Sequence, residues 1–114
     1  MKLDEYQERG EKYDSSKNVE KGMVGDAMVE KTLGIAGEAG EVADKLKKII
    51  WWKDKKISEE DKWEIVKELG DVMWYVAAVA RYLEVPLSEV CERNLEKLQS
   101  RMDRDRLFGD GDNR

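Results

Sequence analysis

Residues 33–48 read LGIAGEAGEVADKLKK, and this stretch decides the fold. Apolar side chains return every three or four positions from Ile35 through Ala39, Val42 and Leu46 to Ile49, and Met28 lies two turns before Ile35. That spacing is the period of an amphipathic α-helix with one apolar stripe along its length. It predicts a single helix over residues 26–52, whose stripe must be covered by another helix.

Further helices are expected on both sides of this one. A capping box, Ser58-x-x-Asp61, marks the start of a second long helix, and the chain's one proline, Pro86, precedes a third. The predicted segments are a short helix over residues 1–13, a loop over 14–25, and helices over 58–84 and 87–103. The sequence therefore predicts an all-α fold of about four helices.

The composition excludes several classes of protein. A length of 114 residues fits one small domain. Charged residues make up 41% of the chain, and no apolar run approaches the ~20 residues of a membrane-spanning helix, so we expect no membrane partner. A net charge of −5 argues against a nucleic-acid polymer as ligand. The absence of histidine excludes Ser-His-Asp triads and histidine-ligated zinc or iron.

The cysteine content and the first residues bear on location. Cys91 is the only cysteine, so no internal disulfide can form, as is usual in a reducing compartment. The first ten residues, MKLDEYQERG, contain no apolar signal segment. We therefore expect a cytoplasmic protein, and if it is an enzyme, carboxylates and lysines must carry the chemistry.

The same acidic motif occurs in both long predicted helices. Glu38-Ala-Gly-Glu41-Val in the first and Glu68-Leu-Gly-Asp71-Val in the second both read Glu-x-Gly-acid-Val. In a helix, the two acids of each pair lie about 60° apart, on a side that borders the apolar stripe. An ordinary solvated face lies opposite the stripe instead. Packing the two stripes together should therefore bring four carboxylates toward one another.

Four converging carboxylates predict a metal site, because they cannot all stay ionised without a cation. We expect Mg²⁺, with Mn²⁺ able to substitute, because these ions prefer oxygen ligands. Gly34, Gly37, Gly40 and Gly70 lie in or beside the motifs, and each costs a helix interior about 1 kcal/mol relative to alanine. They indicate close approach of a ligand or a neighbouring backbone. A chain with 26 acidic residues also produces acidic pairs that bind no metal.

A metal held by acidic helices usually serves a polyphosphate, so cations are expected nearby. Asn94, Lys97 and Arg101 share one face of the last predicted helix and can meet phosphate oxygens; a solvated basic face is the alternative. Lys45 continues the carboxylate side of the first long helix and can reach a phosphate or screen the acids. Trp52, on that same side, is the best candidate to stack a base.

Two tryptophans lie on a third side of their predicted helix. On the helical wheel, Trp63 and Trp74 lie away from both the apolar stripe and the acids. Aromatic surface of that size predicts cover by a second chain. A helical hairpin this small also often needs a partner to complete its core.

These motifs resemble those of the MazG-like all-α nucleoside triphosphate pyrophosphohydrolases. The similarity rests on LGIAGEAGEVADKLKK at residues 33–48, KELGDVMWYVAAVA at 67–80 and LSEVCERNLEKLQSR at 87–101. It covers residues 26–103, and the GDGDNR ending at 109–114 also resembles tails in this family. The resemblance implies a MazG-like helical bundle completed by oligomerisation. It assigns residues 1–103 to the pyrophosphohydrolase domain and 104–114 to a flexible or partner-contacting tail.

The resemblance also implies a reaction. Such enzymes use Mg²⁺ to hydrolyse the α–β bond of (d)NTPs, which gives the monophosphate and pyrophosphate. By that similarity the metal would be held by Glu38, Glu41, Glu68 and Asp71. Glu41 or Glu38 would orient or deprotonate the attacking water. Phosphoryl transfer depends on positioning and charge neutralisation more than on a covalent nucleophile. The reaction therefore does not need an activated serine, cysteine or histidine.

Substrate contacts and assembly are implied in the same way. Asn94 and Lys97 match a family position that contacts the nucleotide. Members associate as dimers or tetramers, with the site completed by the partner chain. Base choice is expected to depend on the loop at 14–25, on Trp51 and Trp52, and on the tail. The expected role is cleaning or adjusting the nucleotide pool.

Two other functions stay open on the residues alone. A non-enzymatic helical interaction module would use the acidic motifs only for solubility and would not bind Mg²⁺ tightly. A metal-dependent hydrolase of another phosphate ester would share the metal site but would release no pyrophosphate from a triphosphate.

Overall fold

The computed structural model describes residues 1–16 and 19–114. Within them the chain forms helices and turns and no strand. The helices are α1 (Leu3–Gly10), a short 3₁₀ helix η1 (Glu11–Tyr13), α2 (Asp26–Trp52), α3 (Glu59–Tyr82) and α4 (Leu87–Asp103). These bounds confirm the all-α class and the predicted helical segments. The loop predicted over 14–25 includes residues 17 and 18, which lie outside the described residues.

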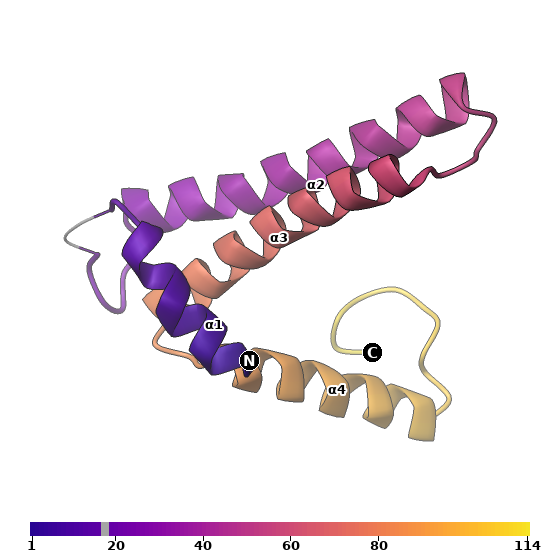
Figure 1. Cartoon of the computed structure of the whole chain (residues 1–114). Coiled ribbons are helices and arrows are strands. Elements are labelled where there is room, and N and C mark those ends of the chain that lie inside the picture. Colours follow the sequence, from indigo (N-terminus) through magenta and orange to yellow (C-terminus); the bar gives the residue numbers. More distant parts are fainter. Residues whose placement is uncertain (17–18) are drawn as a thin grey trace.

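α2 and α3 lie side by side as a long antiparallel hairpin (Figure 1). The predicted capping box begins α3: the Asp61 N–H donates to Ser58 Oγ at 3.1 Å, and the Ser58 N–H donates to the Asp61 carboxylate at 3.1 Å. Lys53, just past the end of α2, lies 2.6 Å from the same carboxylate. Lys53 first, and then Ser58, lower the pKa of Asp61 to about 2. The turn between the helices is therefore fixed by capping and by charge.

The seam of the hairpin is formed by part of the two predicted apolar stripes, since Ala39 and Leu46 of the α2 stripe are exposed. Ile49 of α2 is buried in it, and Ile35 of α2 and Ile65 of α3 are half-buried. At Gly34, an added methyl group would overlap with the ring of Tyr75 on α3. Glycine at this position lets the Tyr75 ring lie directly against the α2 backbone.

α1 crosses the end of the hairpin where α3 turns into α4 (Figure 1). Buried Gln7 of α1 holds this corner, because its Nε2 donates to the carbonyls of Ala77 at 3.2 Å and Val85 at 3.0 Å. Its Oε1 accepts from the Leu87 N–H at 3.0 Å. Most of the buried apolar side chains lie here: Ala77, Ala78, Ala80, Tyr82 and Leu87. The best-buried core is at the corner, not along the hairpin.

Trp74 is covered by α1 of the same chain, which corrects the expectation that it faces a second chain. Its indole N–H donates to the Gly10 carbonyl at 3.1 Å, and the side chain is half-buried. Gly10 suits this contact because a Cβ there would lie 3.3 Å from the indole Cδ1. The helical wheel could not show that the N-terminal helix folds back over this face. Trp63, by contrast, is exposed, as expected.

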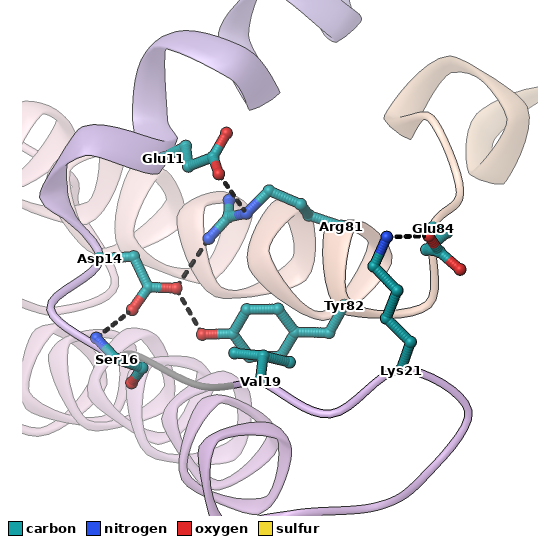
Figure 2. A pocket seen from close by; sticks show the side chains of 8 residues that line it. All are labelled: Glu11, Asp14, Ser16, Val19, Lys21, Arg81, Tyr82 and Glu84. Atoms are coloured by element: carbon teal, nitrogen blue, oxygen red, sulfur yellow. Dashed lines mark hydrogen bonds and ion pairs between the residues drawn. The ribbon is translucent and has the colours of Figure 1, made fainter.

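A buried ionic cluster joins the segment after η1 to both helices of the hairpin. Asp14 and Lys31 of α2 lie 3.3 Å apart, with 4% and 3% of their side chains exposed. Arg81 and Tyr82 of α3 hold the same carboxylate (Figure 2), with Arg81 at 2.7 Å. A hollow of about 330 Å³ lies beside them. Burial alone would raise the pKa of Asp14, but hydrogen bonds, above all from Tyr82, keep it below its ordinary value. The cluster locks the N-terminal segment onto the hairpin.

α4 leaves the corner and diverges from the hairpin, so the chain has an open V shape (Figure 1). The radius of gyration is 17.0 Å, against about 13 Å for a compact domain of this length. Large apolar side chains stay exposed on both arms, including Leu69 on α3 and Leu95 and Met102 on α4. The chain alone does not bury the apolar faces that its helices present.

Candidate metal centre

Carboxylates from both helices meet near the middle of the hairpin. Glu38 of α2 and Glu68 and Asp71 of α3 each offer one oxygen, and these three oxygens lie within 4.8 Å of one another. Glu38 and Glu68 are half-buried because they border the seam, and Asp71 is exposed at its rim. The structure therefore brings together three of the four carboxylates that the acidic motifs contribute.

The like charges change the protonation of Glu38. Partial burial raises the pKa of this carboxyl, and a hydrogen bond with Glu68 and the negative charges of Asp71 and Glu41 raise it further. Like charges this close cannot all stay ionised without a counterion. Without a cation, Glu38 therefore keeps its proton to a higher pH than an ordinary glutamate does.

Glu41 and Lys45 flank the three carboxylates. Glu41 is exposed on α2 and is not among the three gathered residues, although its charge acts on Glu38. Lys45 Nζ lies 3.6 Å from the Glu68 carboxylate, in a pair that is mostly buried. One lysine beside several carboxylates leaves the cluster with excess negative charge.

The donor set fits a hard divalent cation. Three carboxylate oxygens in one small volume are ligands that Mg²⁺ and Mn²⁺ prefer, and such ions complete their shell with water. The chain has no histidine, and its one cysteine, Cys91, belongs to α4. Ligands for softer metals are therefore missing from this cluster.

Three glycines leave the surface beside the cluster open. Gly37, Gly40 and Gly70 have no other part of the described chain within 4 Å of the place that a Cβ would take. Of the four glycines expected to serve a close approach, only Gly34 meets a neighbour among residues 1–16 and 19–114. The open strip leaves room for a ligand or a second chain to approach the acids.

A hollow of about 260 Å³ lies between α2 and α3, on the hairpin-tip side of the cluster. Lys45 belongs to both sites, because it pairs with Glu68 and lines the hollow. Trp52 is 71% exposed and stands in the wall. The full lining is Lys45, Lys48, Ile49, Trp52, Lys53, Asp61, Glu64 and Ile65. The two substrate-binding candidates of α2 therefore share one concave surface.

Lys48 is a wall residue of this hollow and is not among the predicted substrate-binding residues. It lies three residues after Lys45 and four before Trp52, so helical spacing alone places all three on one side of α2. The same spacing also suits a plain surface lysine, so it does not by itself mark Lys48 as a substrate contact. Lys53 follows the end of α2, where helical spacing no longer predicts a direction.

The phosphate-binding candidates of α4 lie on the other arm of the V (Figure 1). Asn94 is exposed. Lys97 and Arg101 both contact the carboxylate of Asp112 in the C-terminal tail, at 2.7 Å and 3.0 Å. No sequence pattern indicated Asp112, because the tail has no helical period to orient its side chains.

Tyr6 is a further residue beside the acids. Burial first, and then the charge of Asp71, raise the pKa of its hydroxyl, which lies 3.5 Å from the Gly70 carbonyl. Tyr6 belongs to α1 and to neither acidic motif, so the sequence does not mark it as a site residue. Its place near Asp71 depends on how α1 crosses α3.

Comparisons with known proteins point to one family. Residues 29–104 match the family model described as the MazG nucleotide pyrophosphohydrolase domain. The chain is 57% identical over 83 residues to the Gene 37 protein of Mycobacterium phage L5, which is 73% of each chain. No solved structure matches. Among the described residues, no helix is long and apolar enough to span a membrane.

Proposed function

The chain belongs to the MazG nucleotide pyrophosphohydrolase family, and we propose that it is a Mg²⁺-dependent enzyme that cleaves the α–β bond of (d)NTPs to the monophosphate and pyrophosphate. The matched region, residues 29–104, includes the whole acidic cluster. The observation that carries the proposal is the gathering of Glu38, Glu68 and Asp71 within 4.8 Å.

The gathered carboxylates are the proposed metal ligands. When bound, Mg²⁺, or Mn²⁺ in its place, would supply positive charge against the phosphate oxygens, on which charge develops during phosphoryl transfer. Glu38, Glu68 and Asp71 would hold the ion, because their oxygens already lie together and repel one another. Relief of that repulsion links metal binding to the stability of the hairpin.

Glu41 is the carboxylate that we expect to orient the attacking water and take its proton. A general base must reach the water through a hydrogen bond and have a free lone pair to accept the proton. Glu41 is exposed and stands outside the three gathered carboxylates, so its oxygens remain available. Glu38 is the alternative base, but its oxygen belongs to the cluster.

Two surfaces are proposed to receive the nucleotide. In the hollow beside the acids, Trp52 offers a flat ring to a base, and Lys45 offers a cation to a phosphate. Asn94, Lys97 and Arg101 would add contacts from α4. Because α4 diverges from the hairpin, we expect these contacts to form across two chains of an oligomer.

A homo-oligomer, either a dimer or a tetramer, is part of the proposal. Its support is the open shape of the chain and the exposed apolar side chains of both arms, among them Leu69, Trp63 and Leu95. A small helical domain of this kind gains its missing core from a second copy. We place its action in the cytoplasm, in cleaning or adjusting the nucleotide pool.

The test is product analysis with the purified full chain, Mg²⁺ and each common NTP and dNTP in turn. We expect monophosphate and pyrophosphate in equal amounts, with Asp71→Asn inactive. Diphosphate and phosphate as products would overturn the assignment of the cleaved bond. No turnover of any nucleotide would overturn the proposal.

Two glutamine variants separate the roles of the carboxylates. Glu41→Gln should lower turnover by about 100-fold or more and keep Mn²⁺ binding, measured by calorimetry. Glu38→Gln should lose both turnover and Mn²⁺ binding. Asp44→Asn is the matched control on α2, because Asp44 pairs with Lys47 and Lys48 and not with the cluster. Loss of Mn²⁺ binding in Glu41→Gln would make Glu41 a ligand instead of the base.

A further inference from the structure

The C-terminal tail places a carboxylate on the cations of α4. Asp112 Oδ1 accepts hydrogen bonds from Lys97 Nζ at 2.7 Å and from Arg101 Nη2 at 3.0 Å. Arg101 Nη2 also donates to the main-chain carbonyl of Asp112. Lys97 first, and then Arg101, lower the pKa of the Asp112 carboxyl, which is therefore ionised at neutral pH.

The tail is folded so that this carboxylate is held in place. Arg114 donates to the carbonyls of Leu107 and Gly111, which closes the tail into a loop. Arg104, at the end of α4, donates to the carbonyl of Arg114 at 2.8 Å. Gly109 and Gly111 have φ of 144° and 83°, which glycine adopts without strain. Figure 1 shows the tail curling back from the end of α4.

A carboxylate between a lysine and an arginine stands where a phosphate group would bind. Both anions accept charge-assisted hydrogen bonds from the same cations, and arginine binds both in a planar, two-pronged way. With Asp112 in place, only 6% of the Arg101 side chain is exposed, so Arg101 cannot reach a ligand.

The Lys97 side of the contact with Asp112 is exposed to solvent. Lys97 is 37% exposed and Asp112 is 76% exposed. An ion pair as exposed as Lys97–Asp112 contributes little to stability, because water and salt screen it. Arg101 itself is buried, but the Asp112 carboxylate that it holds lies on the solvent side. An incoming anion can therefore take the place of the carboxylate without unfolding α4.

We propose that Asp112 competes internally for Lys97 and Arg101 with the phosphate groups of the ligand, and that the tail leaves α4 when such a ligand binds. The inference rests on the proposed function, because it takes the ligand to be the nucleotide substrate or its pyrophosphate product. The tail lowers the apparent affinity of the site for both, and its release accompanies binding.

Calorimetry with inorganic pyrophosphate tests the competition without any turnover. Asp112→Asn in the full chain should bind pyrophosphate about twofold to fivefold more tightly than the wild type. Asp110→Asn is the matched control: it removes the same charge from the same tail, and the described part of the chain shows no ion pair at Asp110. Its affinity should stay within about twofold of the wild type.

Two more measurements separate competition from a general charge effect. On a Lys97→Ala background, the gain from Asp112→Asn should shrink, because the two residues act on one contact. Trypsin cleavage after Arg106 should quicken when pyrophosphate is added to the wild type, because the tail is released.

Equal gains in pyrophosphate affinity in Asp112→Asn and Asp110→Asn would refute the proposed competition. The absence of pyrophosphate binding in the wild type and in both variants would also refute it. Weaker binding by Asp112→Asn would also overturn it and make Asp112 a positioning residue for Lys97. Turnover of NTPs with no difference between the two tail variants would refute this inference alone. Tighter binding by Asp112→Asn without hydrolysis of any nucleotide would refute the proposed function alone.

Discussion

Glu38 on α2 and Glu68 on α3 face each other across the hairpin, with carboxyl oxygens within 4.8 Å. Their contact raises the pKa of Glu38, beyond what partial burial does. At such positions beside an apolar seam, two apolar residues would stabilise the hairpin more than two acids do. The acids therefore lower the stability of the metal-free fold, which is the expected cost of the proposed cation site.

Mg²⁺ should stabilise the folded protein, because its site exists only after folding. At 100 times its Kd, the ion would add about 2.7 kcal/mol to the free energy of unfolding, and EDTA should remove this gain. Asp71→Asn should lose most of the gain, while its metal-free stability equals or exceeds that of the wild type because one repelling charge is gone. Thermal unfolding with and without Mg²⁺ measures both effects.

Asp44→Asn controls for the loss of a carboxylate elsewhere on the hairpin and should keep the full response to Mg²⁺. A wild-type melting temperature that does not change on adding Mg²⁺ or EDTA would contradict the metal assignment.

The contribution of Glu38 to the stability of the metal-free protein should fall as the pH rises above 4.5, the ordinary pKa of a glutamate. Because the pKa of Glu38 is raised in the folded state, its contribution to stability is complete below the unfolded-state pKa. That contribution is lost as the pH rises through the folded-state pKa. In urea unfolding with EDTA, the free energy of unfolding of Glu38→Gln should therefore rise relative to that of the wild type as the pH rises. A difference that does not vary with pH would refute this.

Gly34→Ala and Gly37→Ala should change stability in opposite directions. The new methyl group at residue 34 would overlap with the Tyr75 ring, at a cost of about 1–3 kcal/mol. At residue 37 it meets nothing within 4 Å in the described part of the chain, so the higher helix propensity of alanine should add up to about 1 kcal/mol. Urea unfolding of both variants measures this. A stabilised Gly34→Ala would show that the ring can move aside.

Gln7→Ala should lower the free energy of unfolding by about 2–4 kcal/mol, because it leaves buried backbone groups of Val85 and Leu87 without partners. Gln99→Ala is the control: Gln99 is exposed and bonds to Asp103 on the same helix, so its loss should cost less than about 0.5 kcal/mol. Denaturant unfolding compares the two. Equal effects would mean that Gln7 does not hold the corner.

The helices were predictable because their causes are local. The spacing of apolar residues around Val42 and Val72, the Ser58–Asp61 capping box and the break at Pro86 each act within a few residues of chain. The acidic pairs were predictable for the same reason, since helical geometry alone puts Glu38 and Glu68 on the side that borders the stripe.

The corner and the tail were not predictable, because their contacts join residues far apart in the sequence. Trp74 looked outward on the wheel, but α1 covers it through Gly10. Arg101 looked available to a phosphate, but the Asp112 carboxylate holds it.

The sequence by itself determined the helices, their apolar stripes and the side of each stripe that carries the acids, since each follows from spacing along one helix. Only the tertiary structure decided which carboxylates meet, that Glu41 stays outside them, and that the α4 cations lie on a separate arm. These depend on how the helices cross and on single long-range contacts such as that of Gln7 with Leu87, which no periodicity encodes.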